Sequence, residues 1–577
     1  MNLSRIPAAL ILLSTLAGCA ANNSGKTMAG TNAADKSVKA DQLILGNIIT
    51  VNEYKPVAEA MTVKDGLIQF VGSEDVARAM CDEGTEVLDY GDNYVYPGFL
   101  EAHAHGAGAG IRLAGQADLT SGTCVEDYLE TMKAWMESHP DKEVFCGSGW
   151  KGWLIENPVK ETLDAICPDK PMVLTSLDGH SVWVNSALLK QQNIDKAYAE
   201  KMGPAQVHVD AEGNPTGMIS EGAAAPLLKI DKITHEDLRN YILAWQDFAF
   251  AKGYTAASEA GTEMAGEDAK KAYSELGAEG KLKFRTYAYH LVADDSTTPE
   301  ADVAAALEDI RLLNNEYFKV IGMKIFIDGV IEARTGWTLA DYADQPGYNG
   351  LQRYANHDVA VRLLEESSRN GLSVHAHTIG DGAVRFMLDA IEEAAKETGD
   401  FDQRNILVHL QLVAPEDFKK FADYGVIAGT APLWVPKSSA FQQEVDYVGL
   451  EAAERAYPIG SFIDAGVVNV SHTDYPVSTE ISIPLTFYRG VLRHSPGNPA
   501  NQRNAAECIS REDVLKSMTI NVAYLWKEED RLGSLEVGKI ANATVFDKNF
   551  LEDDMEDVAK ARLIATVVDG KQVYSAE

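Results

Sequence analysis

The sequence predicts an α/β protein with a (β/α)8 barrel of the TIM type and a small β-domain formed by both ends of the chain. Strand-like apolar runs alternate with helical stretches between residues 98 and 529, a pattern typical of a parallel sheet. Their number, about eight, favours closure into a barrel. Short β-rich runs with Asp-Gly and Asn turns occupy residues 41–97 and 530–577, which predicts that the two chain ends complete one β-domain.

The order of strands and helices supports the barrel. An open doubly wound sheet would share the alternation, but no G-x-G-x-x-G motif follows an early strand to indicate a dinucleotide site. Amphipathic helices are expected at Val359–Asn370 and Asp381–Gly399, where apolar residues recur at i, i+3 and i+4. The expected strands lie within Tyr96–Gly108, Pro171–His180, Tyr254–Gly261, Phe318–Gly329, Gly371–His377, Arg404–Gln411, Gly425–Pro432 and Gly466–Pro476.

The composition excludes some classes of partner. Of 577 residues, 46% are hydrophobic and 24% are charged, which is ordinary for a folded globular protein. The 51 basic against 86 acidic residues give a formal charge of −35, which repels nucleic acids and anionic membrane surfaces. We therefore expect a small-molecule ligand and no nucleic acid, and a homo-oligomer is compatible with the sequence.

The N-terminus resembles an export signal. Arg5 precedes a short apolar run from Ile6 to Leu16, and small residues follow. The segment "LAGC", ending at Cys19, resembles a bacterial lipobox, so we expect a signal peptide over 1–18, a lipidated Cys19 and a flexible tether over 19–40. This arrangement predicts a lipoprotein on the periplasmic face of a bacterial membrane; a soluble periplasmic or secreted protein is the alternative.

The remaining cysteines do not indicate a metal site. They are odd in number, dispersed and without C-x-x-C spacing, so neither a disulfide bridge nor free thiols can be chosen from the sequence. They are Cys81, Cys124, Cys146, Cys167 and Cys508.

Two histidines close the first expected barrel strand. In a strand, residues i and i+2 point to the same side, so His103 and His105 can both face a barrel mouth and bind one ion. Neutral imidazole is a good zinc ligand. An H-x-H pair alone is weak evidence, because paired histidines also serve as polar or packing residues.

Four further strand ends strengthen this interpretation. Each carries a charged or strongly polar residue after an apolar run, where burial is costly without a partner or a metal. Individually, Lys324 could pair with a core carboxylate, His409 could be a core histidine and Asp474 could cap a helix. Together they favour one joint metal site in a barrel, because the ends of the strands meet at one rim. The four residues are Lys324, His377, His409 and Asp474.

From about Asp41 to its end, the chain resembles the amidohydrolase superfamily, and most closely its YtcJ-like branch, amidohydrolase family 3. The resemblance rests on several ordered motifs that are specific for the family but not for a substrate. They are "YPGFLEAHAH", "DGHSVWVNSALL", "GNPTGMISEGA", "KIFIDGVIEARTG", "HTIGDGAV", "SHTDYPV" and "GSLEVGKIANATVFD".

The resemblance implies a (β/α)8 barrel, a β-sandwich from both chain ends, and one or two divalent metals, most often zinc. His103 and His105 would be the first-strand ligands, and Lys324 a bridging lysine that is often carboxylated. The fifth- and sixth-strand histidines would be His377 and His409, and the last-strand aspartate Asp474; the H-x-I-G-D context selects His377 over His375. The sequence departs from the family pattern at Glu101, Val408, Leu410 and Asn542.

The expected chemistry is hydrolysis by a metal-activated water. A divalent ion lowers the pKa of its water to about 7, and Asp474 would act as general base and then as general acid. His180 could bind the substrate carbonyl or its oxyanion. Four more residues could shape the substrate pocket, although turn capping or packing would also account for them: Trp150, Glu221, Asp328 and Arg334.

These features predict a metal-dependent hydrolase of a carbon–nitrogen bond in a non-peptide amide, an N-acyl or N-formyl group, or a cyclic amide. An esterase, lactonase or deaminase of the same fold is an alternative. A binding or regulatory protein that keeps the barrel without turnover is a second alternative, against which the complete ligand set argues.

Overall fold

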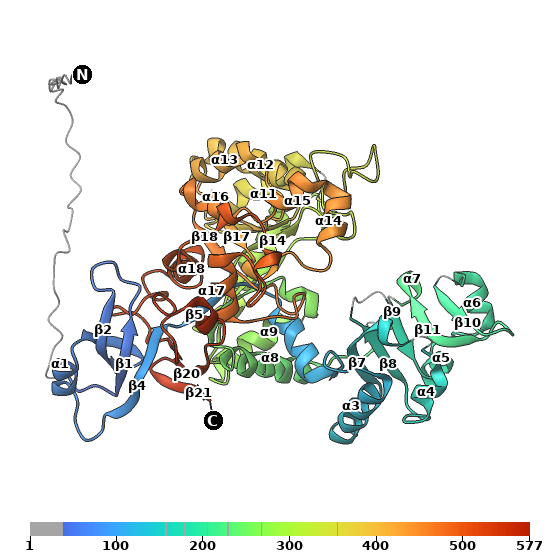
Figure 1. Cartoon of the computed structure of the whole chain (residues 1–577), viewed down its shortest axis with the longest axis horizontal. Coiled ribbons are helices and arrows are strands. Elements are labelled where there is room, and N and C mark those ends of the chain that lie inside the picture. The colour runs from blue at the N-terminus through green and yellow to red at the C-terminus, as the bar shows by residue number, and fades with distance from the viewer. Residues whose placement is uncertain are drawn as a thin grey trace.

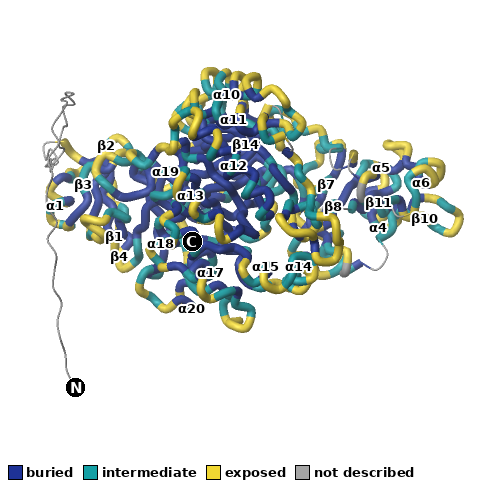
Figure 2. The backbone as a smooth tube through the Cα atoms, turned by 90° about the horizontal axis from the view of Figure 1, so that it is seen from above, coloured by how far each residue is buried: buried dark blue, intermediate teal, exposed yellow. Residues whose placement is uncertain are grey.

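The computed structural model describes residues 38–576, apart from 156–157, 178–180, 205, 225, 228–229, 267 and 355. The expected signal peptide, Cys19 and all but the last residues of the tether lie outside the described residues. The described chain has three parts in a row, with the terminal β-domain at one end, the barrel in the middle and a separate lobe at the other (Figure 1). Buried residues concentrate in the barrel, while exposed residues follow the outer loops (Figure 2).

The barrel is an eight-stranded sheet in which every neighbouring pair is parallel. Its order is β18-β17-β16-β15-β14-β13-β12-β5. The strands are β5 (Phe99–Ala104), β12 (Tyr254–Ala260), β13 (Arg285–Leu291), β14 (Phe318–Phe326), β15 (Ser373–Thr378), β16 (Ile406–His409), β17 (Ile427–Thr430) and β18 (Asn469–Ser471).

Two backbone hydrogen bonds join the outer strands at one rim. The amide of Asp474 donates to the carbonyl of His103 at 3.0 Å, and the amide of His105 donates to the carbonyl of Tyr475 at 2.9 Å. These bonds connect the end of β5 to the segment after β18. The barrel is therefore closed at the rim where the expected ligands lie.

Helices follow the barrel strands and cover the outside of the sheet. The amphipathic α12 packs one apolar face, including Val384, Leu388 and Ile391, against the sheet and ends at Gly399, whose φ of 75° suits glycine. The helices of the barrel region are α2 (Gly106–Gly110), α8 (His235–Phe250), α9 (Ala269–Ala278), α10 (Pro299–Leu313), α11 (His357–Arg369), α12 (Asp381–Thr398), α13 (Phe418–Asp423), α14 (Phe441–Val448), α15 (Leu450–Arg455), α16 (Ile459–Asp464), α17 (Ile483–Leu492), α18 (Arg511–Ser517) and α19 (Ile520–Leu525).

The terminal β-domain uses both ends of the chain, as the sequence predicts. It is one seven-stranded sheet in the order β21-β20-β19-β4-β1-β2-β3, and a bridge between Leu67 and Ile540 shows that the sheet curls back on itself. Its strands are β1 (Gln42–Ile49), β2 (Val57–Lys64), β3 (Leu67–Gly72), β4 (Glu86–Pro97), β19 (Ala543–Phe546), β20 (Leu563–Val568) and β21 (Lys571–Ser575), with α1 (Glu74–Ala79) and α20 (Met555–Val558) beside them.

A separate lobe is inserted between β5 and β12. Its six-stranded sheet runs β10-β11-β9-β8-β7-β6 and is distinct from the barrel sheet. The lobe contains β6 (Ala117–Asp118), β7 (Phe145–Trp150), β8 (Met172–Ser176), β9 (Ser181–Val184), β10 (Val207–Val209) and β11 (Pro215–Ser220), with α3 (Val125–Ser138), α4 (Lys160–Asp164), α5 (Ser186–Gln191), α6 (Lys196–Met202) and α7 (Glu221–Ala224).

The lobe corrects one strand assignment. The run expected in the barrel at Pro171–His180 forms β8, which belongs to the lobe, and the missing barrel strand is β13. The sequence of β13, RTYAYHL, places polar residues among its aromatic ones and so lacks the continuous apolar run that marks a buried parallel strand. The predicted range 98–529 therefore contains both the barrel and the lobe.

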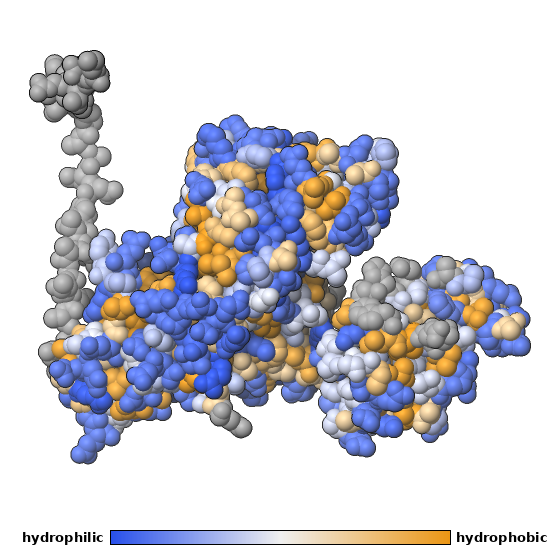
Figure 3. Space-filling view, viewed as in Figure 1, coloured by the Kyte–Doolittle hydropathy of each residue, from blue (hydrophilic) through white to orange (hydrophobic). Residues whose placement is uncertain are grey.

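The visible surface is mostly hydrophilic. Hydrophilic residues cover most of the visible face of the β-domain and much of the barrel, with smaller hydrophobic patches between them (Figure 3). Among the described helices, none combines the length and apolarity needed to span a bilayer. The described cysteines are all free thiols: Cys81, Cys124, Cys146, Cys167 and Cys508.

Candidate metal centre

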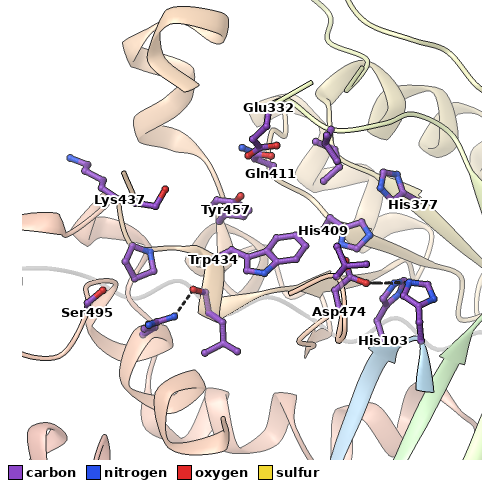
Figure 4. A pocket seen from close by; sticks show the side chains of 18 of the residues that line it. His103, Glu332, His377, His409, Gln411, Trp434, Lys437, Tyr457, Asp474 and Ser495 are labelled. Carbon is purple, nitrogen blue, oxygen red and sulfur yellow. Dashed lines mark hydrogen bonds and ion pairs between the residues drawn. The ribbon is translucent and has the colours of Figure 1, made fainter. Parts of the chain in front are cut away.

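Three of the expected ligands converge at the closed rim of the barrel. The Nε2 atoms of His103 and His105 lie 3.2 and 3.3 Å from Oδ1 of Asp474, and all three side chains are buried. Their ligand atoms all lie within 4.8 Å of one another. Figure 4 shows His103 and Asp474 side by side at one end of a pocket. The i, i+2 spacing of the H-x-H pair thus brings both imidazoles to the same carboxylate.

The other two expected histidines face the same pocket. His377 near the end of β15 and His409 at the end of β16 have ring centroids 4.6 Å apart, and His409 lies 5.0 Å from His103 by the same measure. Trp434 stacks on His409 at 5.5 Å with an angle of 15° between the planes. The four histidines and Asp474 line one cavity of about 580 Å³.

Lys324 is buried on β14 with its amine unpaired. Its side chain has no exposed surface, and Nζ has no hydrogen-bond partner among the described residues. Burial lowers the pKa of Lys324 to about 7, although the nearby charge of Asp474 acts in the opposite direction. A substantial share of this lysine is therefore a neutral amine near neutral pH.

The other candidate ligands are in the protonation states that a metal site needs. Burial holds the pKa of His103 and of His409 well below its ordinary value, and neighbouring cationic groups lower it further. Burial alone would raise the pKa of Asp474, but the close contact of its Oδ1 with Nε2 of His105 at 3.3 Å holds this pKa below its usual range. At neutral pH, His103 and His409 are therefore neutral imidazoles and Asp474 is a carboxylate, which are the forms that bind divalent metals.

Two of these residues have strained backbones. His409 has a φ of 79° and Asp474 a φ of 57°, in the left-handed region that favours glycine. Such conformations cost about 1–3 kcal/mol each and persist where the surrounding structure requires them, often at functional sites. The strain at both positions indicates that side-chain placement, rather than backbone preference, determines the conformation of this rim.

The donor set fits a divalent metal ion. Oδ1 of Asp474 and Nδ1 of His409 are buried without a hydrogen-bond partner among the described residues, in addition to the amine of Lys324. Burial of unpaired polar groups costs about 1–3 kcal/mol each, and a bound cation would compensate the carboxylate. Imidazole nitrogen and carboxylate oxygen atoms at this spacing are ligands that zinc accepts.

Asp328 holds the candidate ligand His377 in place. Its buried carboxylate accepts hydrogen bonds from Nδ1 of His377 at 3.1 Å and from the backbone amides of Ile379 and Gly380 at 3.0 and 2.8 Å. It also accepts one from the amide of Trp337 at 2.9 Å. A carboxylate in this position fixes the ring and tautomer of a ligating histidine. The structure thus places Asp328, expected in the substrate pocket, beneath His377.

Arg334 and Trp150, two of the other expected substrate residues, are not among the residues that line the cavity. Arg334 pairs with Asp344, and its guanidinium lies 3.7 Å from the ring of Tyr447. Trp150 is buried in the lobe, where its indole N–H donates to the carbonyl of Leu174 at 2.8 Å. Glu221 begins α7 of the lobe, and His180 lies outside the described residues.

Several residues that line the cavity are not predicted from the sequence. Trp434 and Leu433 follow β17, within an apolar segment whose only signal is its place after an expected strand end. Gln411 lies two residues after His409 and donates to Glu444, which Arg503 holds in a buried ion pair. The walls beyond the histidines include Leu433, Trp434, Gln411, Tyr457 and Glu332.

Glu101 and His375 contact the segments that carry the candidate ligands His103 and Asp474. One oxygen of Glu101 accepts hydrogen bonds from the amides of His103 and Thr473, both at 3.0 Å, and so joins the two ligand-bearing segments. Burial raises the pKa of Glu101 to about 8, although these bonds oppose the shift. Nε2 of His375 lies 2.6 Å from Nδ1 of His103.

Several known proteins resemble this chain in sequence. A sequence profile of the amidohydrolase family matches residues 86–574. The Bacillus subtilis protein YtcJ, a putative amidohydrolase by name, is 27% identical over 539 residues, which cover 92% of this chain and 98% of YtcJ. The N-substituted formamide deformylase of Arthrobacter pascens is 25% identical over 557 residues, which cover 92% of this chain and 98% of the deformylase.

Solved structures agree on the architecture. An uncharacterized metal-dependent hydrolase from Pyrococcus furiosus is 26% identical and has a TM-score of 0.70, covering 89% of this chain and 100% of that one. A second, from Pyrococcus horikoshii, is 24% identical with a TM-score of 0.71 and covers 89% of this chain and 99% of that one. The chain belongs to the amidohydrolase family and has the fold of a metal-dependent hydrolase.

Proposed function

We propose that this protein hydrolyses a carbon–nitrogen bond other than a peptide bond, in a non-peptide amide, an N-formyl or N-acyl group, or a cyclic amide. The observation that carries the proposal is the convergence of His103, His105 and Asp474 within 4.8 Å at the end of a cavity. The match to an N-substituted formamide deformylase over 92% of the chain supports a substrate of this class.

The residues would hold a divalent ion, for which zinc is the expected metal. When bound, the ion supplies Lewis acidity and lowers the pKa of a water molecule to about 7. His103, His105 and Asp474 would hold a divalent ion, and His377, His409 and Lys324 would be able to supply further ligands at the same rim. Asp328 keeps the ring of His377 in place through the 3.1 Å hydrogen bond.

Asp474 is the proposed proton carrier. Because its contact with His105 holds the pKa of its carboxyl low, Asp474 is ionised and can accept a proton from water. As a new carbon–oxygen bond forms and the carbon–nitrogen bond breaks, Asp474 returns that proton to the leaving nitrogen. His180 would bind the carbonyl oxygen or its oxyanion, as the sequence predicts.

The cavity favours an uncharged substrate with an apolar group beside the scissile bond. The apolar Trp434, Leu433 and Phe326 are among its lining residues, as are the polar Ser438, Ser495 and Asn501. Figure 4 shows Lys437 and Ser495 at the end opposite Asp474. The cations among the lining residues are neutralised, since Lys437 lies 2.6 Å from Glu454 and Arg489 pairs with Glu480. No unpaired cation in the described lining therefore selects an anionic substrate.

Lys324 is proposed to be carboxylated, because carboxylation would convert a side chain that is cationic when protonated into an anionic oxygen ligand for a cation. Carbon dioxide adds to the neutral amine, forming an N–C bond with loss of one proton. Because burial lowers its pKa to about 7, a larger fraction of Lys324 is neutral at pH 8 than at pH 6.

We expect metal uptake by the metal-free protein to be faster with bicarbonate, and faster at pH 8 than at pH 6. Carbon-13 NMR after loading with labelled bicarbonate should show a carbamate in the wild type and none in Lys324→Met. A metal-loaded wild type without a carbamate signal would rule out the modification.

The proposed reaction class is tested by metal analysis combined with panels of amides, lactones and aminoheterocycles. Turnover of N-formyl, N-acyl or cyclic amides by metal-loaded protein, lost with a chelator and restored by zinc, supports the proposal. Faster turnover of lactones or aminoheterocycles would favour an esterase, lactonase or deaminase of the same fold. Tight binding without turnover on any panel would favour a binding protein.

We also propose export as a lipoprotein through Cys19, on the basis of the N-terminal motif. In that case the wild type should sediment with membranes and Cys19→Ser should be released into the periplasm. A wild type that is found in the soluble fraction would contradict the anchor.

A further inference from the structure

The ligand His103 has a second contact on the side away from Asp474. Its Nδ1 lies 2.6 Å from Nε2 of His375, and both side chains are buried. His103 belongs to β5 and His375 to β15, which lie four positions apart in the closed ring of eight strands. The contact therefore crosses the barrel interior from one wall to the other.

This contact determines which nitrogen of His103 carries a proton. A neutral imidazole has one N–H donor and one acceptor nitrogen. Nε2 of His103 faces Asp474 at 3.2 Å and must keep its lone pair free to bind a metal. Nδ1 must then carry the proton and donate it to Nε2 of His375. His375 in turn carries its own proton on Nδ1, which is buried without a hydrogen-bond partner among the described residues.

We propose that His375 is a positioning residue that accepts the hydrogen bond from Nδ1 of His103 and so fixes the tautomer and ring orientation of this ligand. The proposal rests on the metal site of the proposed function. His375 lies two residues before His377 on the same strand, so one strand supplies a ligand at the rim and a support one layer below.

The two supported ligands differ in the group behind them. His377 donates to the carboxylate of Asp328, whereas His103 donates to a neutral imidazole. A second buried carboxylate beneath His103 would lie in the same interior as Glu101 and Asp474, which already bring acidic groups to this side of the barrel. A neutral acceptor orients His103 without adding another negative charge there.

The ring of His375 is itself held in place. Tyr289 on β13 packs against it with centroids 4.5 Å apart and an angle of 66°, an edge-to-face arrangement. Tyr289 therefore provides a matched control. Tyr289→Phe keeps the packing of the ring and leaves the bond between His103 and His375 untouched.

The test measures zinc affinity of the full chain by competition with a chromophoric chelator. His375→Leu removes the acceptor and is expected to weaken zinc binding by about 10- to 100-fold, the usual effect of losing such a support. His375→Gln can place its amide oxygen near the position of Nε2, so it should restore affinity to within a few-fold of the wild type. Tyr289→Phe should match the wild type.

A second measurement separates positioning from general damage to the core. The absorption spectrum of the cobalt-loaded protein should change in His375→Leu and be recovered in His375→Gln, while circular dichroism confirms that each variant is folded. Equal zinc affinity of His375→Leu and the wild type would overturn the proposal, as would a folded His375→Gln as weak as His375→Leu. A wild type that binds no zinc would instead overturn the metal site itself.

Discussion

Asp474→Asn is expected to remove nearly all turnover while the protein keeps its fold and most of its metal. Asparagine has the size of aspartate and retains one oxygen near His103 and His105, but it cannot accept a proton at neutral pH. Loss of a general base typically costs about 10²- to 10⁴-fold in rate. The measurements are kcat on the best amide from the panel and zinc content by elemental analysis.

The control for this variant is Asp417→Asn. Asp417 is also buried but pairs with Arg385, away from the cavity lining. Asp417→Asn should lose stability rather than intrinsic activity, so kcat per folded molecule should stay near the wild-type value. Unchanged kcat in Asp474→Asn would remove Asp474 from the role of proton carrier and leave it, at most, as a ligand.

The convergence of the candidate metal ligands could be predicted because parallel strands place their carboxyl ends at one rim. Each of His377, His409 and Lys324 is a polar residue at or near the end of an apolar strand, where burial is costly unless the side chain has a partner or a metal. The prediction for β8 is wrong because it relies on the same kind of pattern. Its sequence MVLTS has the apolar character of a buried parallel strand, and local pattern does not specify which sheet a strand joins.

The cavity walls could not be predicted in the same way. Trp434 lies in a short 3-10 helix after β17 and reaches the cavity only through the path of its loop, which the sequence pattern does not determine. Arg334 is expected in the pocket because it belongs to a family motif. Its guanidinium instead pairs with Asp344, ten residues further along the chain. Residues at strand ends are placed by the sheet, whereas residues in loops are placed by packing that the sequence leaves open.

The arrangement of ligands also predicts how many ions the centre holds. His103, His105 and Asp474 place their ligand atoms within 4.8 Å of one another. His377 and His409 form a second pair with ring centroids 4.6 Å apart, and Asp328 supports that pair separately. Lys324, if carboxylated as proposed, would be able to bridge the two sets. We therefore expect two equivalents of zinc after loading in the presence of bicarbonate.

Single substitutions should separate the two sets. His105→Ala and His409→Ala are each expected to retain one equivalent of zinc and to lose roughly a thousandfold in kcat, the equivalent of about 4 kcal/mol of transition-state stabilisation. His357→Ala is the matched control, because His357 is a partly exposed histidine on α11 outside the cavity lining. Elemental analysis and kcat are measured on the same samples. If the wild type binds one equivalent and both variants lose it, a single ion is held by both sets of ligands, and a bridging role for Lys324 is excluded.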